Sequence, residues 1–175
     1  MSDEPRTNAE IADLFTLFGF WTSRGVDISL DTLLTTLRKH HVSTAATITT
    51  TAIFSDFVLG NRQTIAACRN NPNLVPIATL DPRRHLAWED ALQQAIQQGC
   101  WLFALFPETQ GWWADEHSLR TLAQAILDAG AALMVEASQQ GGPGRAAAAS
   151  ADAAHPDKQV ILTGVNYRNL GEALS

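Results

Sequence analysis

Residues 100–107 are the longest apolar run of the chain and read Cys100-Trp101-Leu102-Phe103-Ala104-Leu105-Phe106-Pro107. A strand that is apolar on both faces is typical of a parallel sheet, because covering layers keep water from either face. The run is too short to span a bilayer as a helix. It therefore predicts a central strand of a parallel α/β sheet.

Segments on both sides of this run alternate between strand and helix patterns. Apolar or β-branched residues predict strands at residues 42–51, 74–80, 131–135 and 160–163. Helical spacing predicts helices at residues 29–39, 61–70, 88–98 and from residue 115 or 116 to about 129, with Ser29 and Asn61 as N-caps of the first two. Two more helices are expected, an alanine-rich one over residues 143–155 and one from Asn166 onward.

The expected strand centres recur roughly every 30 residues, which is the size of a βα repeat. This alternation specifies a parallel sheet with helices outside it. Six such units form either an open doubly wound sheet, as in flavodoxin-like folds, or about three quarters of a (βα)8 barrel. We expect a single α/β domain over residues 1–175, with residues 1–8 as a disordered lead-in.

Residues 11–19 have two readings. Ile11, Leu14, Phe15 and Phe18 fall at helical spacing, and Gly19 is a helix stop signal. The same residues also fit a buried strand. Their place ahead of the regular repeats favours the first strand of the series.

Residues Asp13 to Gly19 resemble the opening strand of the amidohydrolase-related (amidohydrolase 2) family of metal-dependent hydrolases. In that family the strand reads Asp-x-His-x-His, followed by an aromatic residue and a glycine. Looser similarities follow in the same order as in the family, at residues 56–61, 71–82, 98–107 and 155–164. The resemblance implies an incomplete TIM-like (βα) barrel of about six βα units, with mostly parallel strands and helices outside.

The departures from the family pattern fall on its metal ligands. Phe15 and Leu17 stand where the family has its two histidines, and Glu136 stands where a histidine ends the fifth strand. Gly164 or Val165 matches the histidine after the sixth strand, so Asp13 is the metal-site residue that carries over. Catalytic zinc requires about three protein ligands, so we expect no bound metal or other cofactor; the alternative is a divalent metal such as zinc.

The candidate catalytic residues are Asp13 and Glu136, although a strand-end glutamate is more often solvated or paired with an arginine. Substrate contacts are expected from residues near the predicted mouth of the barrel: Phe15, Leu17, Asp81, Trp112 and Trp113. The two tryptophans contact a ligand or partner, or they plug the loop onto the core. A new metal site would have to combine His85 or His117 with nearby carboxylates: Asp81, Glu108, Asp115 or Glu136.

Composition limits the partners and the location. The formal net charge of −6 and the pI near 5.2 argue against a nucleic-acid surface, which needs a basic face. Cys68 and Cys100 have no metal-ligand spacing and are expected to be buried, reduced thiols. From the acidic, polar N-terminus we expect no signal peptide. We expect a soluble, cytoplasmic protein without a membrane partner.

Two functional readings follow. The first is an amidohydrolase-like domain that has lost metal-dependent hydrolase activity and acts as a binding or interaction protein, with a small-molecule ligand. The alternative is an active metal-dependent hydrolase or decarboxylase acting on a small cyclic or carboxylated substrate, so whether the chain is an enzyme stays open. Unpaired edges on the first and sixth strands predict a homo-oligomer.

Overall fold

The computed structural model describes residues 10–21, 25–83, 88–112, 116–136 and 160–163. They build one seven-stranded sheet in the order β2-β1-β3-β4-β5-β6-β7, in which only β2 runs antiparallel. The strands are β1 (Ile11–Trp21), β2 (Val26–Ile28), β3 (Val42–Thr49), β4 (Leu74–Ala78), β5 (Leu102–Leu105), β6 (Ala132–Glu136) and β7 (Val160–Thr163). The helices are α1 (Leu30–Lys39), α2 (Thr50–Phe54), α3 (Phe57–Arg69), α4 (Trp88–Gln97) and α5 (Glu116–Asp128).

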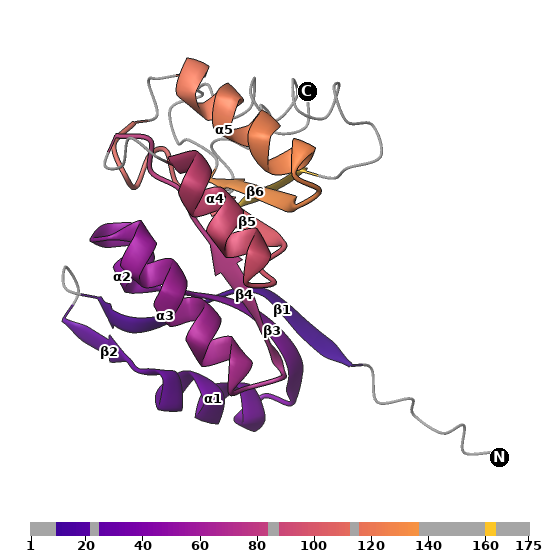
Figure 1. The fold of residues 1–175 in the computed structure, drawn as a ribbon. Coiled ribbons are helices and arrows are strands. Elements are labelled where there is room, and N and C mark those ends of the chain that lie inside the picture. Colours follow the sequence, from indigo (N-terminus) through magenta and orange to yellow (C-terminus); the bar gives the residue numbers. More distant parts are fainter. Residues whose placement is uncertain (1–9, 22–24, 84–87, 113–115, 137–159, 164–175) are drawn as a thin grey trace, which may run out of the picture.

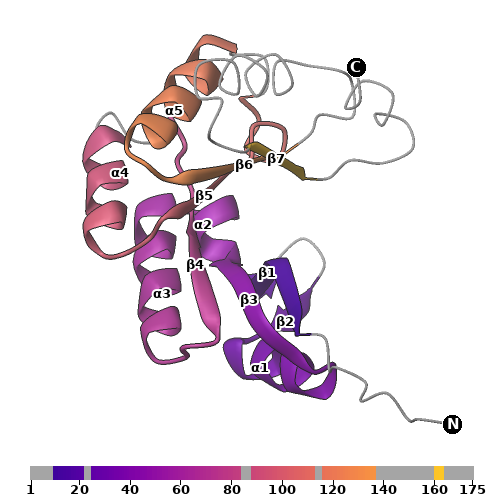
Figure 2. The same ribbon diagram turned by 90° about the vertical axis from the view of Figure 1, so that its right-hand side faces the viewer.

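The six parallel strands curl into a half-barrel, with α3, α4 and α5 along its outer face (Figures 1 and 2). This confirms the predicted fold class, an incomplete TIM-like barrel of βα units. Residues 11–19 form a strand, and the five strands predicted after them are present within a few residues of their expected bounds. The expected helices at residues 143–155 and from Asn166, and the lead-in at 1–8, lie outside the described residues.

Three local features differ from expectation. The short strand β2 pairs with Gly19–Trp21 of β1 and was not predicted. The strand predicted to reach residue 51 ends at Thr49, because Thr50 begins α2. Asn61 does not cap α3: the helix begins four residues earlier, where the Oδ1 of Asp56 accepts a hydrogen bond from the Leu59 N–H at 2.9 Å.

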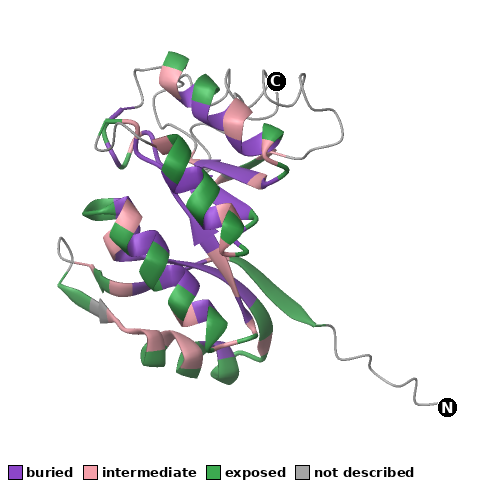
Figure 3. Cartoon of the chain, viewed as in Figure 1, coloured by how far each residue is buried: buried purple, intermediate pink, exposed green. Residues whose placement is uncertain are grey.

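Alternate residues of the strands supply two apolar layers. One layer packs between the sheet and the outer helices and includes Ala78, Phe103, Leu105, Leu133 and Val135 from the strands with Leu119, Leu122 and Ile126 from α5. The other lies on the inner face of the half-barrel and includes Ile48, Ile77, Leu102, Ala104, Phe106 and Met134. Figure 3 shows that burial is greatest along the central strands and low along the first residues of β1. Among the described helices, none is long and apolar enough to cross a membrane.

Candidate binding site at the strand ends

The carboxyl ends of parallel strands meet at one end of a half-barrel, and this is where sites lie in folds of this class. Here polar side chains follow β4 and β5 and end β6. Asp81 and Arg83 follow β4, Thr109 and Gln110 follow β5, and Glu136 is the last residue of β6. The substrate-binding candidate Asp81 and the catalytic candidate Glu136 are therefore both at the expected end of the sheet.

The buried side chain of Asp81 forms an ion pair with the partly exposed side chain of Arg83. The Arg83 Nε donates to Asp81 Oδ1 at 3.2 Å and Nη2 donates to Oδ2 at 3.1 Å, while the Arg83 backbone N–H donates to Oδ1 at 3.0 Å. The Asp81 side chain is 2% exposed and that of Arg83 is 41% exposed. A planar guanidinium held by two parallel bonds has a fixed orientation, so the fold presents Arg83 to solvent in a defined position.

Glu136 is held by the turn that follows β5. One carboxylate oxygen accepts a hydrogen bond from the Thr109 backbone N–H at 2.9 Å, and the Thr109 hydroxyl donates to the other oxygen. The contact ties the end of β6 to the neighbouring turn. Among the described residues, half-buried Glu136 is thus fixed by hydrogen bonds from Thr109 rather than by an arginine, and it acts as a positioned hydrogen-bond acceptor.

Trp112 is part of the core. It is buried in the layer between the sheet and the helices, and its indole N–H donates to Gln110 Oε1 at 2.8 Å. Of the two roles predicted for the tryptophans, this position fits a plug that anchors the loop. Trp113 lies outside the described residues.

Two polar side chains of α3 close the ends of the strands, a role that was not predicted for either of them. The Asn61 side chain donates to the Thr79 carbonyl at 2.8 Å and accepts from the Thr79 N–H at 3.0 Å, as a neighbouring strand would. The Thr64 hydroxyl accepts from the Thr49 N–H at 3.1 Å. In contrast, the buried Thr79 Oγ1 has no hydrogen-bond partner among the described residues. The sequence signal for this role was the presence of two hydrophilic residues, Asn61 and Thr64, within a helical segment.

Asp13 does not meet these residues. It pairs with Ala45, which pairs in turn with Leu74, the first residue of β4, so Asp13 lies at the amino end of the sheet. Its Oδ1 accepts a hydrogen bond from the Phe15 N–H at 3.1 Å and the residue is exposed. The structure therefore does not bring Asp13 together with Glu136.

A bulge in β1 also separates Asp13 from Phe15 and Leu17. β1 takes four steps from Asp13 to Leu17, whereas β3 takes three from Ala45 to Ile48, so the alternation of side chains is reversed between them. Phe15 and Leu17 pack on the inner apolar cluster, and the rings of Phe15 and Phe106 have centroids 6.0 Å apart. At both positions an apolar side chain therefore packs against other apolar side chains.

Metal-ligating residues do not gather in the described part of the chain, where no group of three or more His, Cys, Asp or Glu could hold an ion. His117 is exposed at the start of α5, and His85 and Asp115 lie outside the described residues. Both cysteines are free and buried. Burial raises the pKa of the Cys68 thiol to about 12 and that of Cys100 to about 11.

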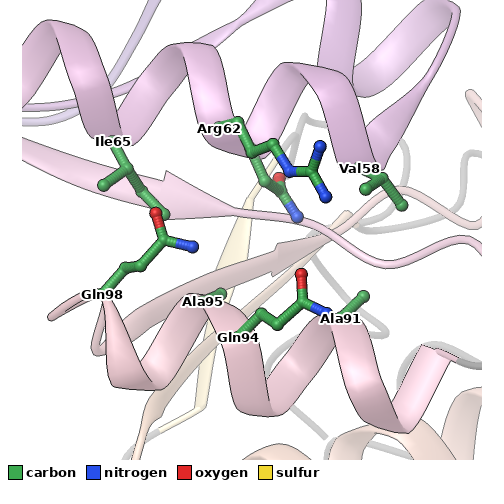
Figure 4. Close-up of a pocket in the computed structure, with 8 residues that line it drawn as sticks. Val58, Arg62, Ile65, Ala91, Gln94, Ala95 and Gln98 are labelled. Atoms are coloured by element: carbon green, nitrogen blue, oxygen red, sulfur yellow. The ribbon is translucent and has the colours of Figure 1, made fainter.

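A separate hollow lies on the outer surface between α3 and α4, lined by residues such as Arg62, Gln94 and Gln98 (Figure 4). Its volume of about 10 Å³ is room for about one water molecule. It lies between two helices, away from the inner face of the half-barrel, and it is a packing furrow rather than a ligand site.

Comparison with known proteins supports the fold. The IDCase of Metarhizium anisopliae in apo form matches with a TM-score of 0.53 and 12% identity, over 73% of this chain and 50% of that one. A Pseudomonas aeruginosa protein described as a dihydrodipicolinate synthetase matches with a TM-score of 0.52 and 16% identity, over 94% and 61%. No family model and no curated protein match the chain.

The fold and these neighbours define a TIM-barrel-like α/β domain. At such identities the likeness shows the fold alone. The chain spans 50% and 61% of the length of the two solved structures.

Proposed function

We propose that the chain is an amidohydrolase-like half-barrel that has lost metal-dependent hydrolysis and binds a small molecule or a partner. One observation carries the proposal: the positions that match the family's metal ligands, Phe15 and Leu17, pack into the inner apolar cluster against residues such as Phe106. Carbon side chains offer no ligand atoms, and Asp13 lies on the opposite side of the bulge. Hydrolysis by a metal-bound water would need several protein ligands around one open position.

Metal content tests this proposal. The purified protein is equilibrated with zinc or manganese, passed over a desalting column and analysed by mass spectrometry, alongside an Asp13→Asn variant. We expect substoichiometric metal in both proteins. One tightly held metal ion per chain that disappears in Asp13→Asn would refute the loss of the metal site and favour the alternative, an active hydrolase or decarboxylase.

The free edge of β1 supports a role in association. Between Ile11 and Phe18, no described strand pairs with the outer edge of β1, and β2 covers only Gly19–Trp21. Ile11 and Leu14 are 48% and 59% exposed there. An exposed apolar strand edge pairs readily with another chain, so we propose a homodimer through β1.

Light scattering coupled to size exclusion measures this directly. We expect a dimer for the wild type and a shift toward monomer for Leu14→Lys, since a charge on an edge strand opposes pairing. Leu59→Lys serves as the matched control, because Leu59 is an exposed leucine of α3 away from that edge. A monodisperse wild-type monomer would exclude the dimer.

A further inference from the structure

Arg83 uses one edge of its guanidinium group and leaves the other open. Nε and Nη2 donate to the two oxygens of Asp81. Among the described residues Nη1 meets no acceptor, although the side chain is anchored and 41% exposed. A guanidinium group has five N–H donors in a fixed plane, so the free edge still has donors pointing away from Asp81.

The loop after β5 passes close to that free edge at a glycine, Gly111. Gly111 has φ of +76°, and a Cβ placed on it would lie 3.4 Å from Arg83 Nη1. The backbone therefore passes Arg83 without a side chain to cover it. The loop itself is fixed by the Thr109 bonds to Glu136 and by the Gln110–Trp112 bond. The backbone that passes Nη1 is thus held in place by these hydrogen bonds.

A second polar group without a partner belongs to the same strand end. Ile77 faces the inner cluster, whereas Ala78 and Leu80 face the helices, so Thr79 faces inward. Its buried hydroxyl lacks a hydrogen-bond partner in the described part of the chain. Buried polar atoms are rarely left unpaired, which indicates that this end of the half-barrel takes up a further polar group or water.

We infer that the open edge of Arg83 binds the carboxylate of a small organic acid. The buried Asp81 fixes the guanidinium before binding, and a carboxylate matches the remaining fork with two parallel charge-assisted bonds. This inference rests on the proposed binding function and names the ligand class for it.

Benzoate is a suitable probe, and benzamide is its uncharged counterpart. The protein is titrated with each by two-dimensional NMR in buffer with a chelator, so that bound metal plays no part. We expect saturable shifts with benzoate at the resonances of residues 79–83 and 107–112, and none with benzamide. Equal binding of the two probes, or no saturation with benzoate, would overturn the inference.

Arg83→Lys keeps the positive charge next to Asp81 but removes the second edge, so it should weaken benzoate binding by about tenfold. Arg62→Lys, on the outer furrow of Figure 4, is the matched control and should bind as the wild type does. Unchanged affinity in a folded Arg83→Lys protein contradicts the assignment. If that variant does not fold, the double variant Asp81→Asn/Arg83→Gln, which leaves no unpaired charge, replaces it with the same expected loss.

The proposed loss of metal-dependent hydrolysis and the proposed carboxylate site are tested independently of each other. Stoichiometric metal would end the proposed loss of hydrolysis without touching the benzoate result, which is obtained with chelator present. Failure of benzoate binding in a metal-free protein would remove the carboxylate site and leave the degenerate metal site as proposed.

Discussion

Strand β5 is buried along its whole length, whereas β1 is exposed over its first four residues. The two sequences are similarly apolar, and their neighbours account for the difference. β5 pairs with β4 and β6 and is covered on both faces, while among the described strands the first part of β1 pairs only with β3. Apolar sequence predicts a strand, but the number of its neighbours sets its burial.

The comparison extends to polar residues. Around the ends of β4 to β6, carboxylates meet defined partners, as Asp81 meets Arg83 and Glu136 meets Thr109. On β1, Asp13 bonds only the backbone of its own strand within the described structure. The half-barrel therefore holds its ordered carboxylates at the carboxyl ends of the packed strands, while the carboxylate of β1 lies at the amino end of the sheet.

Truncating a side chain in each strand tests this contrast and should give the largest effect. Phe103 is fully buried in β5, so Phe103→Ala should lower the free energy of unfolding by about 3–5 kcal/mol. Leu14→Ala on β1 should change it by no more than about 0.5 kcal/mol. Urea unfolding followed by circular dichroism measures both.

A large loss for Leu14→Ala that grows with protein concentration would show that another chain covers β1. The same loss at all concentrations would mean that the strand is covered within its own chain. Equal losses of unfolding free energy in Phe103→Ala and Leu14→Ala would contradict the distinction between an edge strand and a central strand.

The end of β4 should also be sensitive. Asn61→Ala leaves the buried N–H and C=O of Thr79 without partners, which should cost about 2 kcal/mol. Asn70→Ala is the matched control, because Asn70 is exposed at the end of the same helix and should change stability by less than about 0.5 kcal/mol. Equal stability of the two variants in urea unfolding would mean that water replaces the Asn61 amide.

The sequence predicted the repeat of strands and helices because burial enforces regular spacing, and residues 100–107 are apolar enough to specify a central strand. It did not predict β2, which has three residues, or the bulge after Asp13, because a one-residue shift depends on the partner strand. Asn61 matched a capping pattern, yet its amide pairs with Thr79 on another element. Asp81 and Glu136 were placed correctly as strand-end residues, but Arg83 was missed because its role depends on the fold around Asp81.

The buried thiols should make stability fall in alkali. The pKa values of Cys68 and Cys100 are raised from 9.0 to about 12 and about 11 in the folded protein, so the unfolded chain loses these protons first. Their contribution is complete below pH 9 and is lost as the pH rises from 9 through 11 and 12. At pH 10 the loss should be about 1 kcal/mol for each thiol.

Unfolding by urea between pH 8 and 10.5 measures this slope in the wild type and in Cys68→Ala. The variant should lose less stability over that range, whatever its stability at pH 8. The same slope in both proteins would mean that the Cys68 thiol ionises as readily in the folded chain as in the unfolded one.

Thr79→Val should give the smallest effect and the opposite sign. The change keeps the shape of the side chain and removes a buried hydroxyl that has no partner in the described structure, so unfolding should cost up to about 1 kcal/mol more. Thr64→Val, on α3, is the control: its hydroxyl bonds both the Thr49 N–H and the Gly60 carbonyl, and its loss should destabilise the protein. If Thr79→Val is instead as destabilising as Thr64→Val, the Thr79 hydroxyl already bonds an internal water, and the inward-facing end of β4 is hydrated before any ligand arrives.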